Sequence, residues 1–110
     1  MAYDALHGQV VLFGGVDGNN SYLNDTWVWD GSDWSQMIPA TSPSPRYQPV
    51  LAYDSVRGLV VLFGGETSPS VYSDETWVWD GANWTQMFPV AKPAASYLTA
   101  MAFDLSLIPI

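Results

Sequence analysis

The side chains best able to do chemistry in this chain are carboxylates, and each has a competing structural role. Asp17 and Asn19 begin an alternation of oxygen-bearing side chains of the kind that binds calcium. The glycine that such a loop needs is replaced by Tyr22, so we expect a solvated loop. Asp30 and Asp80 each precede a glycine, where an aspartate that caps a turn is expected rather than a metal ligand or an acid–base group.

Nucleophilic and redox chemistry finds little support in the sequence. The chain has no cysteine and one histidine, which excludes a disulfide, a thiolate metal site and a thiol nucleophile. A single histidine is also too few for a copper centre. His7 lies in a short link and shows no partner, so we expect a surface turn residue. The sequence therefore predicts no catalytic residue, no cofactor and no metal, and a protein that is not an enzyme.

Composition narrows the possible partners. The 110 residues carry 3 Lys+Arg against 11 Asp+Glu, a net charge of −8, with 48% hydrophobic and 15% aromatic residues. Such an aromatic chain is expected to pack rather than stay disordered. Three cations cannot form the basic face that nucleic acid or an anionic membrane requires, and no apolar run is long enough to span a bilayer. No signal peptide is visible, and the compartment is left open.

The elements that must position these residues repeat every fifty positions. Val10–Gly15 recurs as Val60–Gly65, Thr26–Gly31 recurs as Thr76–Gly81, and about half of all paired residues are identical. A third copy begins in the last fifteen residues and then stops. The sequence thus divides into a first unit at residues 1–46, a second at 47–95 and the start of a third at 96–110.

Each unit carries the signals of four short strands joined as a meander. A glycine that closes a five-residue link and a later Asp-Gly pair predict two hairpins. The apolar run ending in Phe63 does not alternate, which favours a strand covered on both faces. The first unit keeps only Met1–Asp4 of its innermost strand. For the second unit the local signals predict strands at Gln48–Tyr53, Leu59–Phe63, Thr76–Trp79 and Trp84–Met87.

The repeat resembles the kelch repeat, in the form found in large bacterial proteins. The resemblance covers residues 2–104 and rests on a diglycine after an apolar strand, a following tyrosine, two tryptophans and an arginine that opens the next unit. It implies an all-β fold: two four-stranded antiparallel β-propeller blades plus the first strand of a third, in an incomplete propeller. In the second blade it implies that Tyr47–Tyr53 is the innermost strand and Trp84–Met87 the outermost. The residues that carry it are Gly14, Gly15, Tyr22, Trp27, Trp34, Arg46, Gly64, Gly65, Tyr72, Trp77 and Trp84.

For function, the resemblance implies a non-catalytic binding or scaffold module with a protein partner. The segments Val16–Asp25 and Glu66–Glu75 differ most between the units, as is typical of recognition loops. The alternative is a fragment of a carbohydrate-binding or carbohydrate-active propeller of the galactose-oxidase-like superfamily. The copper site of that superfamily uses a Tyr–Cys cross-link, which this chain cannot form. The possible recognition residues are Asp17, Asn19, Asn20, Tyr22, Glu66 and Tyr72.

Kelch propellers close with six or seven blades, so two blades leave apolar sheet faces bare. Three interpretations stay open: a piece of a longer propeller, a gene remnant, or a homo-oligomer in which three chains give six blades. In the last of these, Tyr97–Phe103 supplies a strand to the neighbour. We expect the repeated tryptophans to pack blade against blade rather than to form a sugar platform. Arg46 is expected to form an ion pair with Asp54 or Asp104.

Overall fold

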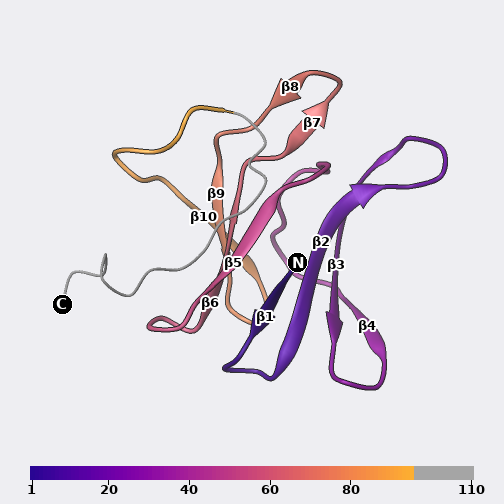
Figure 1. Ribbon diagram of the computed structural model, residues 1–110, viewed down its shortest axis with the longest axis vertical. Helices are drawn as coiled ribbons and strands as arrows, with labels where there is room; N and C mark the ends of the chain where they lie inside the picture. The colour runs from indigo at the N-terminus through magenta and orange to yellow at the C-terminus, as the bar shows by residue number, and fades with distance from the viewer. Residues whose placement is uncertain (96–110) are drawn as a thin grey trace.

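The computed structural model describes residues 1–95, which form an all-β structure without a helix (Figure 1). Within this part of the chain, no helix is long and apolar enough to cross a membrane. The third unit, including the predicted strand Tyr97–Phe103, lies outside the described residues.

The first unit folds into one antiparallel meander, which we call the N-terminal sheet. Its strands follow one another in chain order. The pairing of the two long strands is interrupted by a bulge between Phe13 and Gly15. The strands are β1 (Ala2–Asp4), β2 (Gln9–Val16), β3 (Tyr22–Trp29) and β4 (Trp34–Met37).

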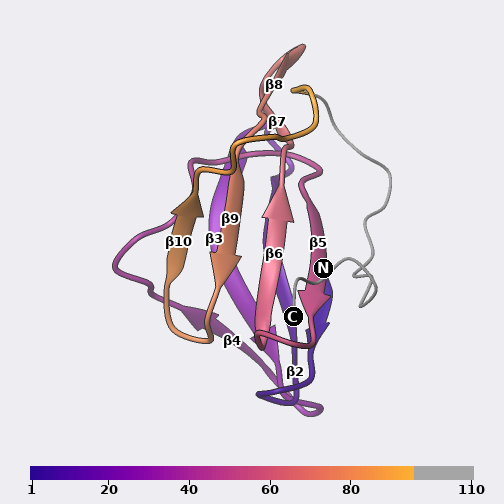
Figure 2. The same ribbon diagram turned by 90° about the vertical axis from the view of Figure 1, so that its left-hand side faces the viewer.

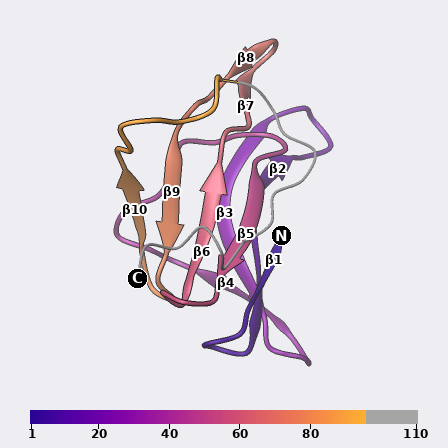
Figure 3. The ribbon, with the colours of Figure 1, turned by 60° about the vertical axis from the view of Figure 1, so that its left-hand side comes forward.

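The second unit forms the C-terminal sheet, again four antiparallel strands in a meander (Figure 3). The prediction of two four-stranded antiparallel sheets is therefore confirmed. A small additional hairpin, which the sequence did not predict, interrupts the second unit. The sheet consists of β5 (Val50–Asp54), β6 (Leu59–Phe63), β9 (Thr76–Trp79) and β10 (Trp84–Met87), and the hairpin consists of β7 (Glu66–Ser68) and β8 (Val71–Tyr72).

The two sheets pack face to face, and the core lies between them. Figure 2 views the C-terminal sheet face-on, with the N-terminal sheet behind it. One face of each sheet contributes its alternate apolar residues, as the period of a strand requires. The core side chains are Val11, Phe13 and Val28 from the N-terminal sheet and Leu51, Val60, Leu62, Trp77, Trp79 and Trp84 from the C-terminal sheet.

The turn chemistry predicted from the sequence is confirmed. Gly58 closes the β5–β6 turn at φ 69°, a left-handed conformation that favours glycine. In the β9–β10 turn, Asp80 Oδ1 accepts hydrogen bonds from the Ala82 and Asn83 amides, each at 2.8 Å. These amides hold the pKa of Asp80 below its ordinary value, since they stabilise the charged carboxylate. Asp80 is thus a turn cap.

One sequence expectation about the strands is wrong. The innermost strand of the second unit begins at Val50 rather than Tyr47, because Gln48 has a positive φ of 55° and Pro49 lacks an amide hydrogen. The β6 strand has buried residues on both faces, since Leu62 is fully buried and Phe63 on the opposite face is 4% exposed. Val61, on the same face as Phe63, is half-buried.

Candidate functional site

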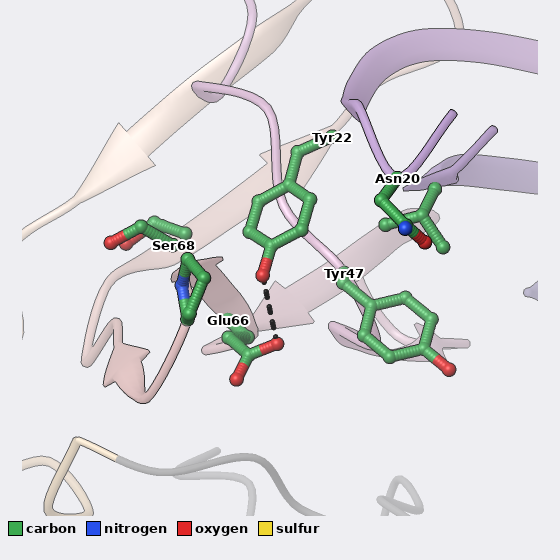
Figure 4. A pocket seen from close by; sticks show the side chains of 8 residues that line it. Asn20, Tyr22, Tyr47, Glu66 and Ser68 are labelled. Atoms are coloured by element: carbon green, nitrogen blue, oxygen red, sulfur yellow. Dashed lines mark hydrogen bonds between the residues drawn. The ribbon is translucent and has the colours of Figure 1, made fainter. Parts of the chain in front are cut away.

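A cavity of about 700 Å³ opens where the two repeats meet at one end of the sheets. The β2–β3 connection and the β7–β8 hairpin both lie at this end (Figure 1). The first repeat contributes Asn20 and Tyr22, and the second unit contributes Tyr47, Glu66 and Ser68 (Figure 4). Neither repeat alone contains this set of side chains, so the site depends on the packing of one sheet on the other.

Glu66 is the charged centre of this cavity, and its carboxylate is held on both oxygens. The Tyr22 hydroxyl donates to Oε1 at 3.0 Å, and the Ser70 amide donates to Oε2 at 3.1 Å. The backbones of Glu66 and Tyr47 form two hydrogen bonds. The Tyr47 amide donates to the Glu66 carbonyl and the Glu66 amide donates to the Tyr47 carbonyl, each at 2.8 Å. The carboxylate is therefore fixed at the Tyr22 hydroxyl, in a cavity that Tyr47 also lines, an arrangement that suits recognition of a cation or a hydrogen-bond donor.

The hydrogen bond from Tyr22 to Glu66 affects the pKa of Tyr22. Removal from water raises the pKa of Tyr22 above its ordinary value near 10, and the hydrogen bond to Glu66 raises it further. The bond thus contributes stability that is complete below pH 10 and is lost as the pH rises through the folded-state pKa. We expect Glu66→Gln to lower the titration midpoint of Tyr22, measured from the chemical shift of its labelled ring. An unchanged midpoint in Glu66→Gln contradicts this assignment.

The glycines of the repeat motif gather around the backbone of Arg46. The Gly15 amide donates to the Arg46 carbonyl at 2.9 Å. A side chain at Gly14 would place its Cβ 2.6 Å from the same oxygen, so this position requires glycine. On the other side, the Arg46 guanidinium donates to the Gly64 carbonyl at 3.1 Å, and its stem packs on Gly65. The diglycines of both repeats therefore seat one arginine.

The Arg46 side chain is fully buried, and its charge is matched by Glu75. Nη2 lies 2.8 Å from Glu75 Oε1, and the same oxygen accepts a bond from Trp77 Nε1 at 3.1 Å. Burial raises the pKa of Glu75, but the bonds from Arg46 and Trp77 outweigh it and hold this pKa below its ordinary value. The predicted partner Asp54 is wrong, because Asp54 pairs with Arg57 at 3.0 Å. Asp104, the other predicted partner, lies outside the described residues.

The tryptophans differ between the repeats in exposure. Trp84 is 1% exposed and donates across the core to Thr26 Oγ1 at 2.9 Å. Its counterpart Trp34 is 43% exposed. Trp77 is buried, whereas Trp27 is half-buried and donates to Asp25 at 2.7 Å. The second-repeat tryptophans therefore pack sheet against sheet, as expected, while those of the first repeat lie on an open face.

His7 has partners that the sequence did not reveal. Its Nδ1 lies 2.7 Å from Oδ2 of Asp4, a fully buried carboxylate. The ring also approaches the β9–β10 turn, where a Cβ at Gly81 would lie 2.7 Å from the imidazole. His7 is an exposed residue of a turn, as the sequence predicted, and the Asp4 carboxylate and the turn of the other repeat both reach it.

The predicted recognition residues separate into two groups. Asn20, Tyr22 and Glu66 line the cavity, although Tyr22 belongs to β3 rather than to a loop. Asp17 instead serves its own loop, where its carboxylate accepts the amides of Asn19 and Ser21.

Tyr72 lies in β8, the strand that pairs with Glu66 of β7. The cavity residues Tyr47 and Ser68 were not among the predicted set. Within residues 1–95, no group of three or more acidic, histidine or cysteine side chains is arranged to hold a metal ion.

No protein-family model matches this chain, and no curated protein is significantly similar to it.

Proposed function

We propose that this chain is a pair of kelch-type propeller blades that acts as a non-catalytic binding module for a protein partner. Two properties support the proposal. Each repeat is a four-stranded antiparallel meander, and the repeats pack face to face with a continuous core. Propeller blades have this construction and this packing.

The observation that carries the binding role is the cavity built jointly by the two repeats. Glu66 supplies a negative charge fixed by the Tyr22 hydroxyl, and the rings of Tyr22 and Tyr47 line the same cavity. A lysine or arginine side chain fits this chemistry, because the cation gains both an ion pair and contact with aromatic faces. The net charge of −8 adds attraction toward a basic partner.

A peptide array carrying lysine and arginine in varied contexts tests this function. We expect binding to basic peptides that falls at least about tenfold in Glu66→Gln and in Tyr47→Ala, because each change removes one part of the cation site. The matched control is Ser55→Ala in the exposed β5–β6 turn at the opposite end, which is expected to bind as the wild type does.

The second candidate is carbohydrate binding, favoured by the two tyrosine rings that line the same cavity. A glycan array run with the same variants separates the candidates. Sugar binding that depends on Tyr47, without peptide binding, supports the carbohydrate candidate and contradicts a basic peptide ligand. Binding on both arrays that is unchanged in Glu66→Gln and in Tyr47→Ala contradicts both candidates.

A further inference from the structure

The open faces of this molecule carry the same residues as its buried interface. The core forms where one face of the N-terminal sheet packs against one face of the C-terminal sheet. We call the first of these a leading face and the second a receiving face. The strand registers place alternate residues on each face. In the core, the leading face presents Ala2, Val11, Phe13, Thr26, Val28 and Met37, and the receiving face presents Tyr53, Val60, Leu62, Trp77, Trp79 and Trp84.

Each sheet has a second face on which most side chains are less buried than their counterparts in the core. Phe63, which is 4% exposed, and Ala52, which is 9% exposed, are the exceptions. The far side of the C-terminal sheet is a second leading face, fifty residues on, and presents Ala52, Val61, Phe63, Thr76, Val78 and Met87. The far side of the N-terminal sheet is a second receiving face and presents Tyr3, Val10, Leu12, Trp27, Trp29 and Trp34. Each of these positions has the same residue as its counterpart in the core, and the one core residue without an identical counterpart is Leu51, which corresponds to Met1.

Several large side chains on the second faces are far more exposed than their counterparts in the core, because no other sheet within residues 1–95 packs on them. Trp84 is 1% exposed, but its twin Trp34 is 43% exposed. Tyr3 and Met87 are 58% and 46% exposed, although their counterparts are packed against the core. Large apolar side chains gathered on a sheet face are typical of an interaction surface. The occupant that matches both faces is another copy of this chain.

We propose that copies of this chain associate head to tail, the C-terminal sheet of one packing on the N-terminal sheet of the next. The internal interface is the template for this contact. There, Trp84 Nε1 donates to Thr26 Oγ1, and the Phe13 ring meets Trp84 edge-on at 5.3 Å. Between copies, Trp34 takes the place of Trp84, and Thr76 of the next copy takes the place of Thr26.

The contact between copies is heterologous, because it joins two different faces. Such contacts form a closed ring when the rotation between copies closes, and a filament when it does not. The internal interface also has a hydrogen bond, from Tyr22 to Glu66, that the contact between copies lacks. Glu66, which binds Tyr22 across the repeats, has Val16 as its counterpart. The association is therefore weaker than the internal packing and depends on concentration. This inference rests on the sheet faces alone and is independent of the cavity.

Light scattering coupled to size exclusion tests the association. We expect the wild-type chain to exceed its 12.1 kDa monomer mass, approaching three copies if the ring has six sheets, and to dissociate on dilution. Trp34→Glu blocks only the receiving face, and Met87→Glu blocks only the leading face. Each variant alone is expected to run as a monomer. Mixed in equal amounts, they are expected to form a one-to-one pair through their unchanged faces.

Val71→Glu is the matched control, because Val71 is 53% exposed but lies on the β7–β8 hairpin outside both faces. It is expected to assemble as the wild type does. A wild-type monomer at every concentration overturns the proposal, and so does a failure of the folded variants to pair. Self-association of either variant alone overturns the head-to-tail arrangement. If circular dichroism shows that one variant is unfolded, Tyr3→Glu and Thr85→Arg replace the pair at other exposed positions of the same two faces.

Discussion

Replacing Arg46 by methionine is expected to lower the free energy of unfolding by about 3–5 kcal/mol. The guanidinium is fully buried and donates to the Gly64 carbonyl, the Ser73 hydroxyl and the Glu75 carboxylate. Methionine fills much of the same volume but donates no hydrogen bond. The Gly64 carbonyl and the Glu75 carboxylate then lose their charged partner, and the junction between the two repeats loses its central polar anchor.

The matched control for this change is Arg57→Met. Arg57 also pairs with an aspartate, but its side chain is 50% exposed, so the loss is expected to stay within about 1 kcal/mol. Urea denaturation followed by tryptophan fluorescence measures both variants. Equal losses in the two variants contradict the assignment of Arg46 as the anchor of the junction.

The features that the sequence predicted well are those set by neighbours in the chain. The Asp80 cap and the positive φ of Gly58 involve residues within four positions of each other, so residue type and spacing suffice to predict them. The four strands of each repeat follow from the same local signals. The start of β5 was wrong by three residues because the positive φ of Gln48 has no local signature.

The polar contacts across the repeats could not be predicted from the sequence, unlike the packing of the tryptophans. Arg46 reaches Glu75 over 29 residues of chain, and the repeat gives no guide, since the counterpart of Arg46 is Ser96. Tyr22 recurs as Tyr72 in the second repeat, and a residue that recurs in both repeats is expected to have a structural role rather than a binding role. Its partner Glu66 is replaced by Val16 in the first repeat, so the cavity arises from a difference between the repeats rather than from what they share.

Replacing Trp84 by alanine is expected to cost about 3–5 kcal/mol at every protein concentration. Its ring is 1% exposed, contacts Phe13 edge-on at 5.3 Å and Trp79 at 5.4 Å, and donates to Thr26. Alanine leaves a cavity between the two sheets that neighbouring strands cannot fill without breaking their pairing. The loss is expected in the denaturation midpoint of a dilute, monomeric sample.

The repeat offers a matched control in Trp34→Ala, the same residue in the same register of the other sheet. Within one chain, Trp34 contacts Trp29 at 5.5 Å and is 43% exposed, so a dilute sample is expected to lose only about 1 kcal/mol. At concentrations where copies associate, the wild type gains stability by mass action and this variant does not. The gap between them therefore widens with concentration, whereas the gap for Trp84→Ala stays constant. If both gaps stay constant, Trp34 is not buried by another copy, and its exposure belongs to the monomer.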